Sequence, residues 1–185
     1  MTLRIEPVRV DNLHPAALRS VFWELGPDAT VVDPEIEKEL WLSRTLMTHG
    51  TCGFSALSFD TPSATVFFAP PTLLPGAATM PSRISADAVL ISSLFADIFD
   101  PGTYAQLLDA TLVHLLGQEV AAVEAFAWRS GPWGHLGLIP DFALEAAGFW
   151  EESAHDELPR YRIELPPSEG LMAVAEVEEL LRVRC

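Results

Sequence analysis

The sequence predicts one α/β domain, with a mixed and mostly antiparallel sheet of about seven strands flanked by four helices. Its length of 185 residues suits a single core and is short for two. Its composition, 49% apolar and 20% charged, is that of a globular protein. Segments with the period of a strand are interleaved with segments with the period of a helix, which is typical of α/β architecture.

Seven segments carry the apolar pattern of strands. The first alternates apolar Leu3 and Ile5 with charged Arg4 and Glu6, as a half-buried strand does. The fourth carries no charge after Asp87 and is expected to be fully buried. The predicted strands are 3–10, 52–59, 64–69, 86–95, 119–128, 149–153 and 161–165.

Four segments have helical spacing, namely 15–25, 34–49, 101–117 and 140–147. Asp33-Pro34 and Asp100-Pro101 supply helix starts, each with a carboxylate cap and a proline where no N–H is needed. We expect the second helix to turn its larger apolar residues inward and its charged residues outward. The inward set is Ile36, Leu40, Trp41 and Met47, and the outward set is Glu35, Glu37, Lys38 and Glu39.

The C-terminal segment 168–184 carries an apolar face at helical spacing, formed by Leu171, Val174, Val177, Leu180 and Leu181. It follows Pro166-Pro167, so we predict a domain over 1–165 and a helical extension over 166–185. That face either covers the chain's own core or contacts a partner, which is a second copy or another protein.

The charge balance is strongly acidic, with 26 acidic residues against 11 basic ones and a net charge of -15. Because phosphate backbones are repelled by such a surface, we expect no nucleic-acid partner. Cationic substrates and basic protein surfaces are favoured. No apolar run approaches the roughly 20 residues that span a bilayer, and the start does not read as a signal peptide, so we expect no membrane contact and a cytoplasmic location.

The metal-ligating and thiol residues are too sparse for a structural site. Cys52 and Cys185 are the only cysteines, which excludes a disulfide framework or a zinc cluster within one chain. The histidines show no ligand spacing, so no metal is predicted.

Several stretches, taken in order, resemble the GNAT family of acyl-CoA-dependent N-acetyltransferases. They are AVLISSLFADIF followed by a helix, then VAAVEAFA, LIPDFALEAAGF and PRYRIEL. They are similar to the family's fourth strand, cofactor helix, fifth strand, closing helix and last strand. Their residue pattern resembles an actinobacterial branch of the family. The resemblance covers about residues 1 to 165 and implies a GNAT-like sheet and helices.

The resemblance also implies acetyl-CoA, or another acyl-CoA, as cofactor. In this family the pantetheine arm lies between the fourth and fifth strands, and the pyrophosphate binds at the start of the helix between them. Unpaired N–H groups and the helix dipole make such a start suited to anions. The matching cofactor-binding positions are Leu94, Phe95 and Ala96 on the strand and Gly102, Thr103 and Tyr104 at the helix start.

The cofactor loop departs from the family pattern and reads as degenerate. The family usually has a basic residue or glutamine and then two glycines, whereas Asp97 to Tyr104 reads DIFDPGTY. We expect Asp100 to cap the helix itself, and Pro101 removes one N–H donor. The tyrosine that many members use as proton donor corresponds to Leu144.

Three residues are candidates for catalysis. Glu124, alone in the apolar strand VAAVEAFA, is a candidate general base, or a residue that faces the cleft without chemistry. His135 has a side chain suited to proton transfer but is equally read as a solvated loop residue. The acid is not assigned, since Tyr104 and Tyr161 are the only two tyrosines and either would serve; Tyr104 is kept as a catalytic candidate. Trp128 and Trp133 either wall an acceptor pocket or, for Trp128 above all, pack in the core.

Two functions therefore remain. The first is direct transfer of an acyl group from acyl-CoA to a small-molecule or peptide amine, with a fourth-strand N–H polarising the thioester carbonyl. The second is a catalytically inactive GNAT-like module that binds a protein. Arg83 and Arg129 are the basic residues that would rescue phosphate binding in the first.

Overall fold

The computed structural model describes residues 3–26, 28–97 and 99–166. The elements in chain order are β1 (Leu3–Pro7), α1 (Pro15–Arg19), α2 (Phe22–Leu25), α3 (Pro34–His49), β2 (Gly53–Ser58), β3 (Thr61–Ala69), β4 (Ala88–Ala96), α4 (Pro101–Leu116), β5 (Ala122–Trp128), β6 (Ile139–Pro140), α5 (Asp141–Ala146), β7 (Trp150–Ser153) and β8 (Arg160–Glu164). The predicted C-terminal helix lies outside the described residues, so the boundary at residue 165 stays a prediction.

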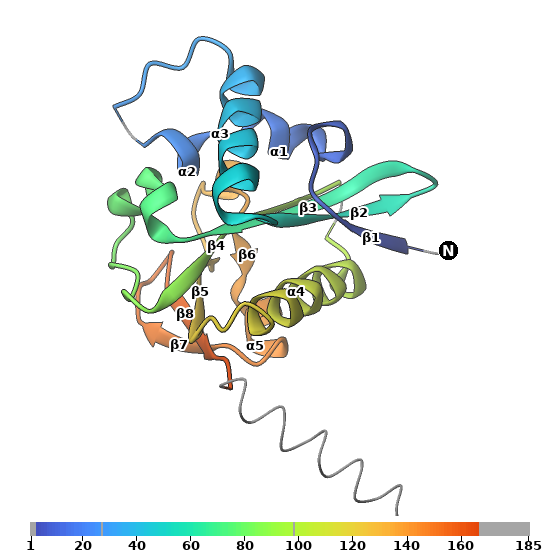
Figure 1. Cartoon of the computed structure of the whole chain (residues 1–185). Helices are drawn as coiled ribbons and strands as arrows, with labels where there is room; N and C mark the ends of the chain where they lie inside the picture. Colours follow the sequence, from blue (N-terminus) through green and yellow to red (C-terminus); the bar gives the residue numbers. More distant parts are fainter. Residues whose placement is uncertain (1–2, 27, 98, 167–185) are drawn as a thin grey trace, which may run out of the picture.

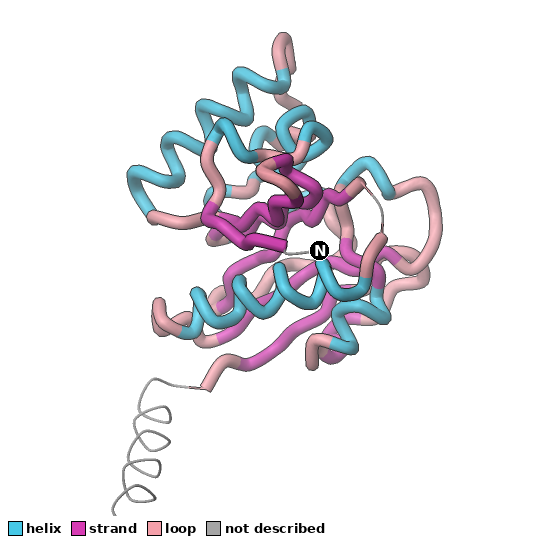
Figure 2. The backbone as a smooth tube through the Cα atoms, turned by 90° about the vertical axis from the view of Figure 1, so that its right-hand side faces the viewer, coloured by secondary structure: helices cyan, strands magenta, loops and turns pink. Residues whose placement is uncertain are grey.

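The described strands form one mixed sheet, in the order β1-β2-β3-β4-β5-β8-β7, with β6 attached beside β5. Neighbours pair antiparallel except β4 with β5 and β5 with β6. Helices α1, α2 and α3 cover one face and α4 and α5 the other (Figures 1 and 2). The predicted α/β class is confirmed, with 8 strands instead of about seven because the short β6 carries no pattern of its own.

Each face of the sheet has its own apolar core. Under α1–α3 the largest buried side chains include Trp23, Phe67 and Phe126, and on the α4 face they include Leu107 and Tyr161. Strand alternation sorts β5 in this way, because Phe126 points to the first core while Val123 and Ala125 point to the second. Glu124 shares the parity of Phe126 and so points toward the α1–α3 face.

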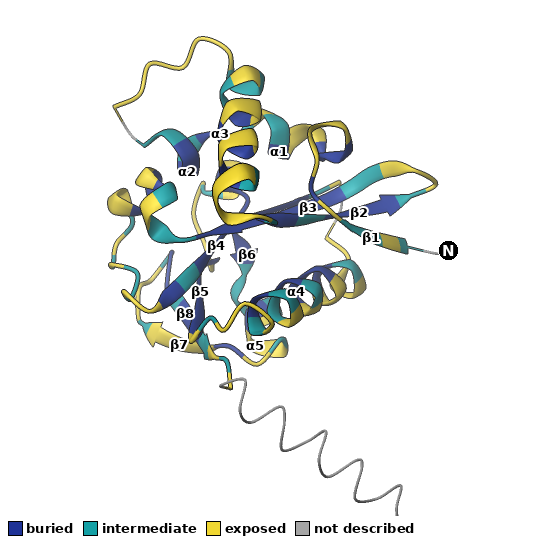
Figure 3. Cartoon of the chain, in the orientation of Figure 1, coloured by how far each residue is buried: buried dark blue, intermediate teal, exposed yellow. Residues whose placement is uncertain are grey.

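The predicted orientation of α3 is confirmed for Trp41, which is buried, and for Glu39, which is exposed, but it is wrong for Ile36, Leu40, Met47 and Lys38. The helix buries Lys38, Trp41, Leu42 and Thr45, and it exposes Ile36, Leu40 and Met47 (Figure 3). Lys38 forms an ion pair with Glu24 of α2, and its ammonium lies 4.6 Å from the centre of the Phe67 ring. Lysines usually face solvent, but Lys38 can be buried because Glu24 of α2 supplies a counter-charge.

The predicted helix over 15–25 is two short helices, which break at Ser20 and Val21. The break allows α2 to turn Trp23 and Glu24 into the core. Asp60, at the predicted hairpin, has a φ of 62° and forms its turn with Phe59, so β3 begins earlier than predicted, at Thr61.

Candidate functional site

The fourth and fifth strands part halfway along β4. Phe67 lies opposite Ser93 while Phe68 lies opposite Ile91, so Ser92 is an extra residue that forms a β-bulge. Pairing between β4 and β5 also ends at this level, at Ile91 and Ala125. The second half of β4 therefore has no pairing with β5, and its backbone groups on that side need other partners.

Another segment of the chain bonds to both strands where they part. The Leu94 N–H donates a hydrogen bond to the Gly137 carbonyl over 2.6 Å. Directly after it, β6 pairs in parallel with β5, with Ile139 opposite Ala127. Residues 137–140, here called the cleft segment, thus bind to both parted strands.

Packing from α2 and β4 holds the cleft segment and the residues before it. The Trp23 indole N–H donates to the Leu136 carbonyl over 3.0 Å, and Leu136 is buried. Gly137 has a φ of 66°, and a Cβ there would lie 2.6 Å from the Phe95 ring. Only glycine fits this close approach without displacement.

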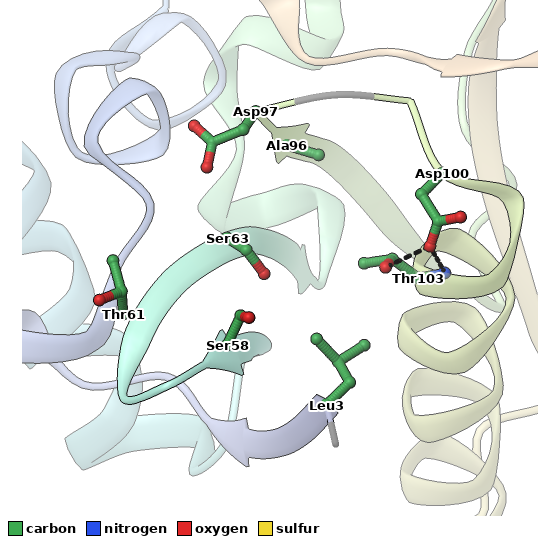
Figure 4. Close-up of a pocket in the computed structure, with 8 residues that line it drawn as sticks. All are labelled: Leu3, Ser58, Thr61, Ser63, Ala96, Asp97, Asp100 and Thr103. Carbon is green, nitrogen blue, oxygen red and sulfur yellow. Dashed lines mark hydrogen bonds between the residues drawn. The ribbon is translucent and has the colours of Figure 1, made fainter. Parts of the chain in front are cut away.

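The N-terminus of α4 is capped by its own chain. The Asp100 carboxylate accepts hydrogen bonds from the Thr103 N–H, over 2.8 Å, and from the Thr103 hydroxyl, over 2.6 Å (Figure 4). These bonds hold the pKa of Asp100 below its usual range. The self-cap expected from the sequence is present, and it uses an N–H that a phosphate would need.

A hollow of about 560 Å³ lies beside this helix start, between the end of β4 and the β2–β3 hairpin (Figure 4). Oxygen atoms dominate its polar lining, which has two carboxylates and four hydroxyls and includes no basic side chain. The Asp97 carboxylate lies 3.0 Å from Nε2 of His14, within hydrogen-bond distance. The lining residues are Leu3, Ser58, Thr61, Ser63, Ala96, Asp97, Asp100 and Thr103. Such a lining repels phosphate groups.

Glu124 is buried in a network of ion pairs. One carboxylate oxygen accepts from Arg162 over 3.0 Å, and the other accepts from Arg160 and from the Ser85 N–H. Although burial alone would raise it, the pKa of Glu124 is lowered by the hydrogen bonds from Ser85 and the two arginines. A carboxylate held in this way is a poor proton acceptor near neutral pH.

The other two catalytic candidates lie elsewhere. The His135 side chain is exposed and bonds to the Pro132 carbonyl over 3.2 Å. Tyr104 is buried in the core on the α4 face, where its ring lies 4.8 Å from that of Phe99 and burial raises its pKa. Glu124 points to the opposite face, so the described structure does not bring the three residues together.

Within the described part of the chain, neither arginine considered for phosphate forms a hydrogen bond or an ion pair with the start of α4. Arg129 is bound by Asp141 over 2.9 Å and by Glu151 over 2.6 Å. Arg83 lines a separate hollow together with Pro71 and Pro75. No residue that lines this hollow belongs to α4.

The two tryptophans do not share a pocket wall by any described contact. Trp128 is exposed and donates to the Gly131 carbonyl, so its predicted core role is wrong. Trp133 donates to Glu157 over 2.6 Å. The position of the usual tyrosine, Leu144, is fully buried.

Sequence reasoning missed the partners of Glu124 and the cleft segment. Arg160 and Arg162 stand two apart on the last strand, a spacing that puts both on one face, and Glu124 is the only charge on the neighbouring strand. That pattern was a usable signal for the ion pairs. The Ser93 hydroxyl, which is buried without a hydrogen-bond partner on the parted half of β4, had no such signal.

Among solved structures, many acetyltransferases share this fold. An N-acetyltransferase from Staphylococcus aureus Mu50 matches with a TM-score of 0.58 and 13% identity over 90% of this chain and 100% of the other. The PaiA N-acetyltransferase from Thermoplasma acidophilum, in complex with coenzyme A, matches with a TM-score of 0.55 and 12% identity over 89% and 99%. A GNAT-family acetyltransferase from Streptococcus pneumoniae gives 0.55 and 13% over 89% and 100%.

These matches establish the fold of this chain as that of the GNAT acetyltransferases. The chain matches no protein-family model and no curated protein. At identities of 11 to 15% the likeness concerns fold, and activity must be argued from the site.

The described residues do not fit an acyl-CoA in the manner the resemblance implies. The Leu94 N–H and the Thr103 N–H both have internal acceptors, and the hollow beside α4 is acidic. Across the described ranges, no helix is long and apolar enough to span a membrane. Within the same ranges, no three His, Cys, Asp or Glu side chains gather as a metal site would require.

Proposed function

We propose that this protein is a non-catalytic binding module built on the GNAT acetyltransferase fold. The observation that carries the proposal is the hydrogen bond from the Leu94 N–H to the Gly137 carbonyl. This N–H is the kind of donor that could bind a thioester carbonyl, and here it already binds an acceptor of the same chain. A donor that already has a short internal partner gains little from a second acceptor.

Two further observations support the proposal. Asp100 places a carboxylate where the resemblance implies a pyrophosphate, so two negative groups would compete for one helix start. Glu124, the leading candidate base, is paired with two arginines and has a lowered pKa. Local contacts thus disfavour both the binding of the cofactor and the acceptance of a proton by Glu124.

A second candidate is acyl transfer from acetyl-CoA to an amine. The parted strands and the bulge at Ser92 favour it, because they preserve the general shape of a cleft between β4 and β5. On this hypothesis the cleft segment leaves β4 before the cofactor binds.

Calorimetric titration with acetyl-CoA, to about 2 mM, separates the candidates. Gly137→Ala is the informative variant, because its Cβ would lie 2.6 Å from the Phe95 ring at a φ of 66°, so the contact between the cleft segment and β4 is strained. Gly134→Ala is the matched control, since a Cβ there meets nothing within 4 Å. The module predicts no saturable binding by any of the three proteins.

Saturable binding by the unaltered protein would overturn the proposal in favour of the acyltransferase. Binding by Gly137→Ala alone would also overturn it, because it would show a functional cleft that the cleft segment keeps closed. Circular dichroism of each variant checks that it is folded.

A further inference from the structure

Helix α3 carries an exposed apolar stripe, here called the α3 stripe, made of Val32, Ile36, Leu40 and Met47. Their exposed fractions are 89%, 55%, 61% and 88%. Ile36, Leu40 and Met47 stand four and seven residues apart, so they lie along one side of the helix, and Val32 lies just before its N-cap. Single exposed apolar residues are ordinary, but a row on one helix face is typical of an interaction surface.

The helix cannot roll to bury this stripe. On its inner side Trp41 donates its indole N–H to the Leu73 carbonyl over 2.9 Å and packs edge-on against Phe67 at 5.7 Å. Lys38, beside it, is held by Glu24. A rotation that buried Leu40 would expose Trp41 and separate the ion pair, so the outward position of the stripe is fixed by the core.

The surroundings of the stripe are acidic. Asp33, Glu35, Glu37 and Glu39 lie in the first two turns of α3 or at its cap, and Arg44 is the one exposed arginine or lysine on this helix. Arg19 of α1 pairs with Glu35 over 3.0 Å, so three of the four carboxylates have no basic partner among the described residues. The chain as a whole carries a charge of -15. A second copy would set two acidic rims against each other, whereas a basic partner would complement this one.

We propose that the α3 stripe docks a basic amphipathic segment of another protein, with apolar side chains on the stripe and lysines or arginines against the acidic rim. This inference names the partner class for the proposed binding role and rests on it. Its recognition mode is a helix face that supplies anchors at spacings of four and seven residues.

The test is fluorescence anisotropy with a synthetic helical peptide of about 18 residues, made of leucine on one face and lysine on the other. The ionic strength is about 0.15 M, at which loose attraction between separated charges is screened. A second peptide has glutamate in place of lysine. We expect saturable binding of the lysine peptide and none of the glutamate peptide.

The double substitution Ile36→Ser, Leu40→Ser removes the centre of the stripe without touching the core and should weaken binding by about tenfold or more. Val113→Ser is the matched control, because Val113 is 71% exposed on α4, a helix on the other face. It should leave the affinity unchanged.

No binding of the lysine peptide, or equal binding by the double variant, would overturn the inference. So would sedimentation showing a dimer of the unaltered protein that the double variant dissociates, since a second copy would then occupy the stripe. Acetyl-CoA has no part in this assay, so binding of the cofactor would sink the proposed function separately from the peptide result.

Discussion

Glu24 and Glu124 are both buried glutamates under the α1–α3 face, yet their surroundings differ. Both oxygens of Glu124 have donors, supplied by Ser85, Arg160 and Arg162. Glu24 has one partner, Lys38, and its second oxygen has none. Burial of a single glutamate is therefore no guide to its reactivity, because the partners that decide it come from other segments of the chain.

The largest effect should follow from breaking the poorer pair. Lys38→Met leaves the Glu24 carboxylate buried without a counter-charge, and we expect a loss of about 3–5 kcal/mol in the free energy of unfolding. Urea denaturation measures it. The double variant Glu24→Leu, Lys38→Met should regain most of the loss, since no buried charge remains.

Glu39→Gln, on the exposed side of the same helix, is the control and should change stability by less than about 0.5 kcal/mol. A Lys38→Met protein as stable as the parent would show that the pair is not held as described.

The better-satisfied carboxylate should produce a pH-dependent effect of smaller size. Because the folded pKa of Glu124 lies below 4.5, its contribution is full above that value and is lost as pH falls through the folded pKa. Glu124→Gln should cost about 1–3 kcal/mol at neutral pH. Its stability curve should approach that of the parent in acid, as followed by urea unfolding between pH 7 and 3. Parallel curves would contradict the lowered pKa.

Carboxylates that cap helices at the surface should matter less than either buried glutamate. Asp33 accepts from the Glu35 and Ile36 N–H groups, and Asp100 accepts from Thr103. Replacement of either by alanine should cost about 0.5–2 kcal/mol. Asp109→Ala, on the exposed side of α4 and away from the start of that helix, serves as the control. An Asp100→Ala protein with unchanged stability would argue against the self-cap.

The smallest effect is expected on the exposed side of α3. Met47→Gln should alter the free energy of unfolding by less than about 0.5 kcal/mol, because Met47 is 88% exposed. Thermal unfolding by circular dichroism is sufficient to measure it. A large loss would mean that the apolar stripe, not the ion-pair side, faces the core.

Much of the fold and less of the site could be predicted. Strand alternation placed β1, and the sequence Asp-Pro located the starts of α3 and α4, because both signals act within a few residues. For the site, the self-cap by Asp100 is equally local and was expected. The pairing of Glu124 was missed, because Arg160 and Ser85 lie 36 and 39 residues away.

By itself the sequence determined the order of elements, the acidic charge and the altered loop before α4, since these depend on neighbouring residues. Only the tertiary structure decided which side of α3 is buried and what lies between β4 and β5. Both apolar and charged residues of α3 recur at helical spacing, so periodicity could not choose between its sides. The choice came from Glu24, and the filling of the cleft from contacts such as that between Trp23 and Leu136, 113 residues apart.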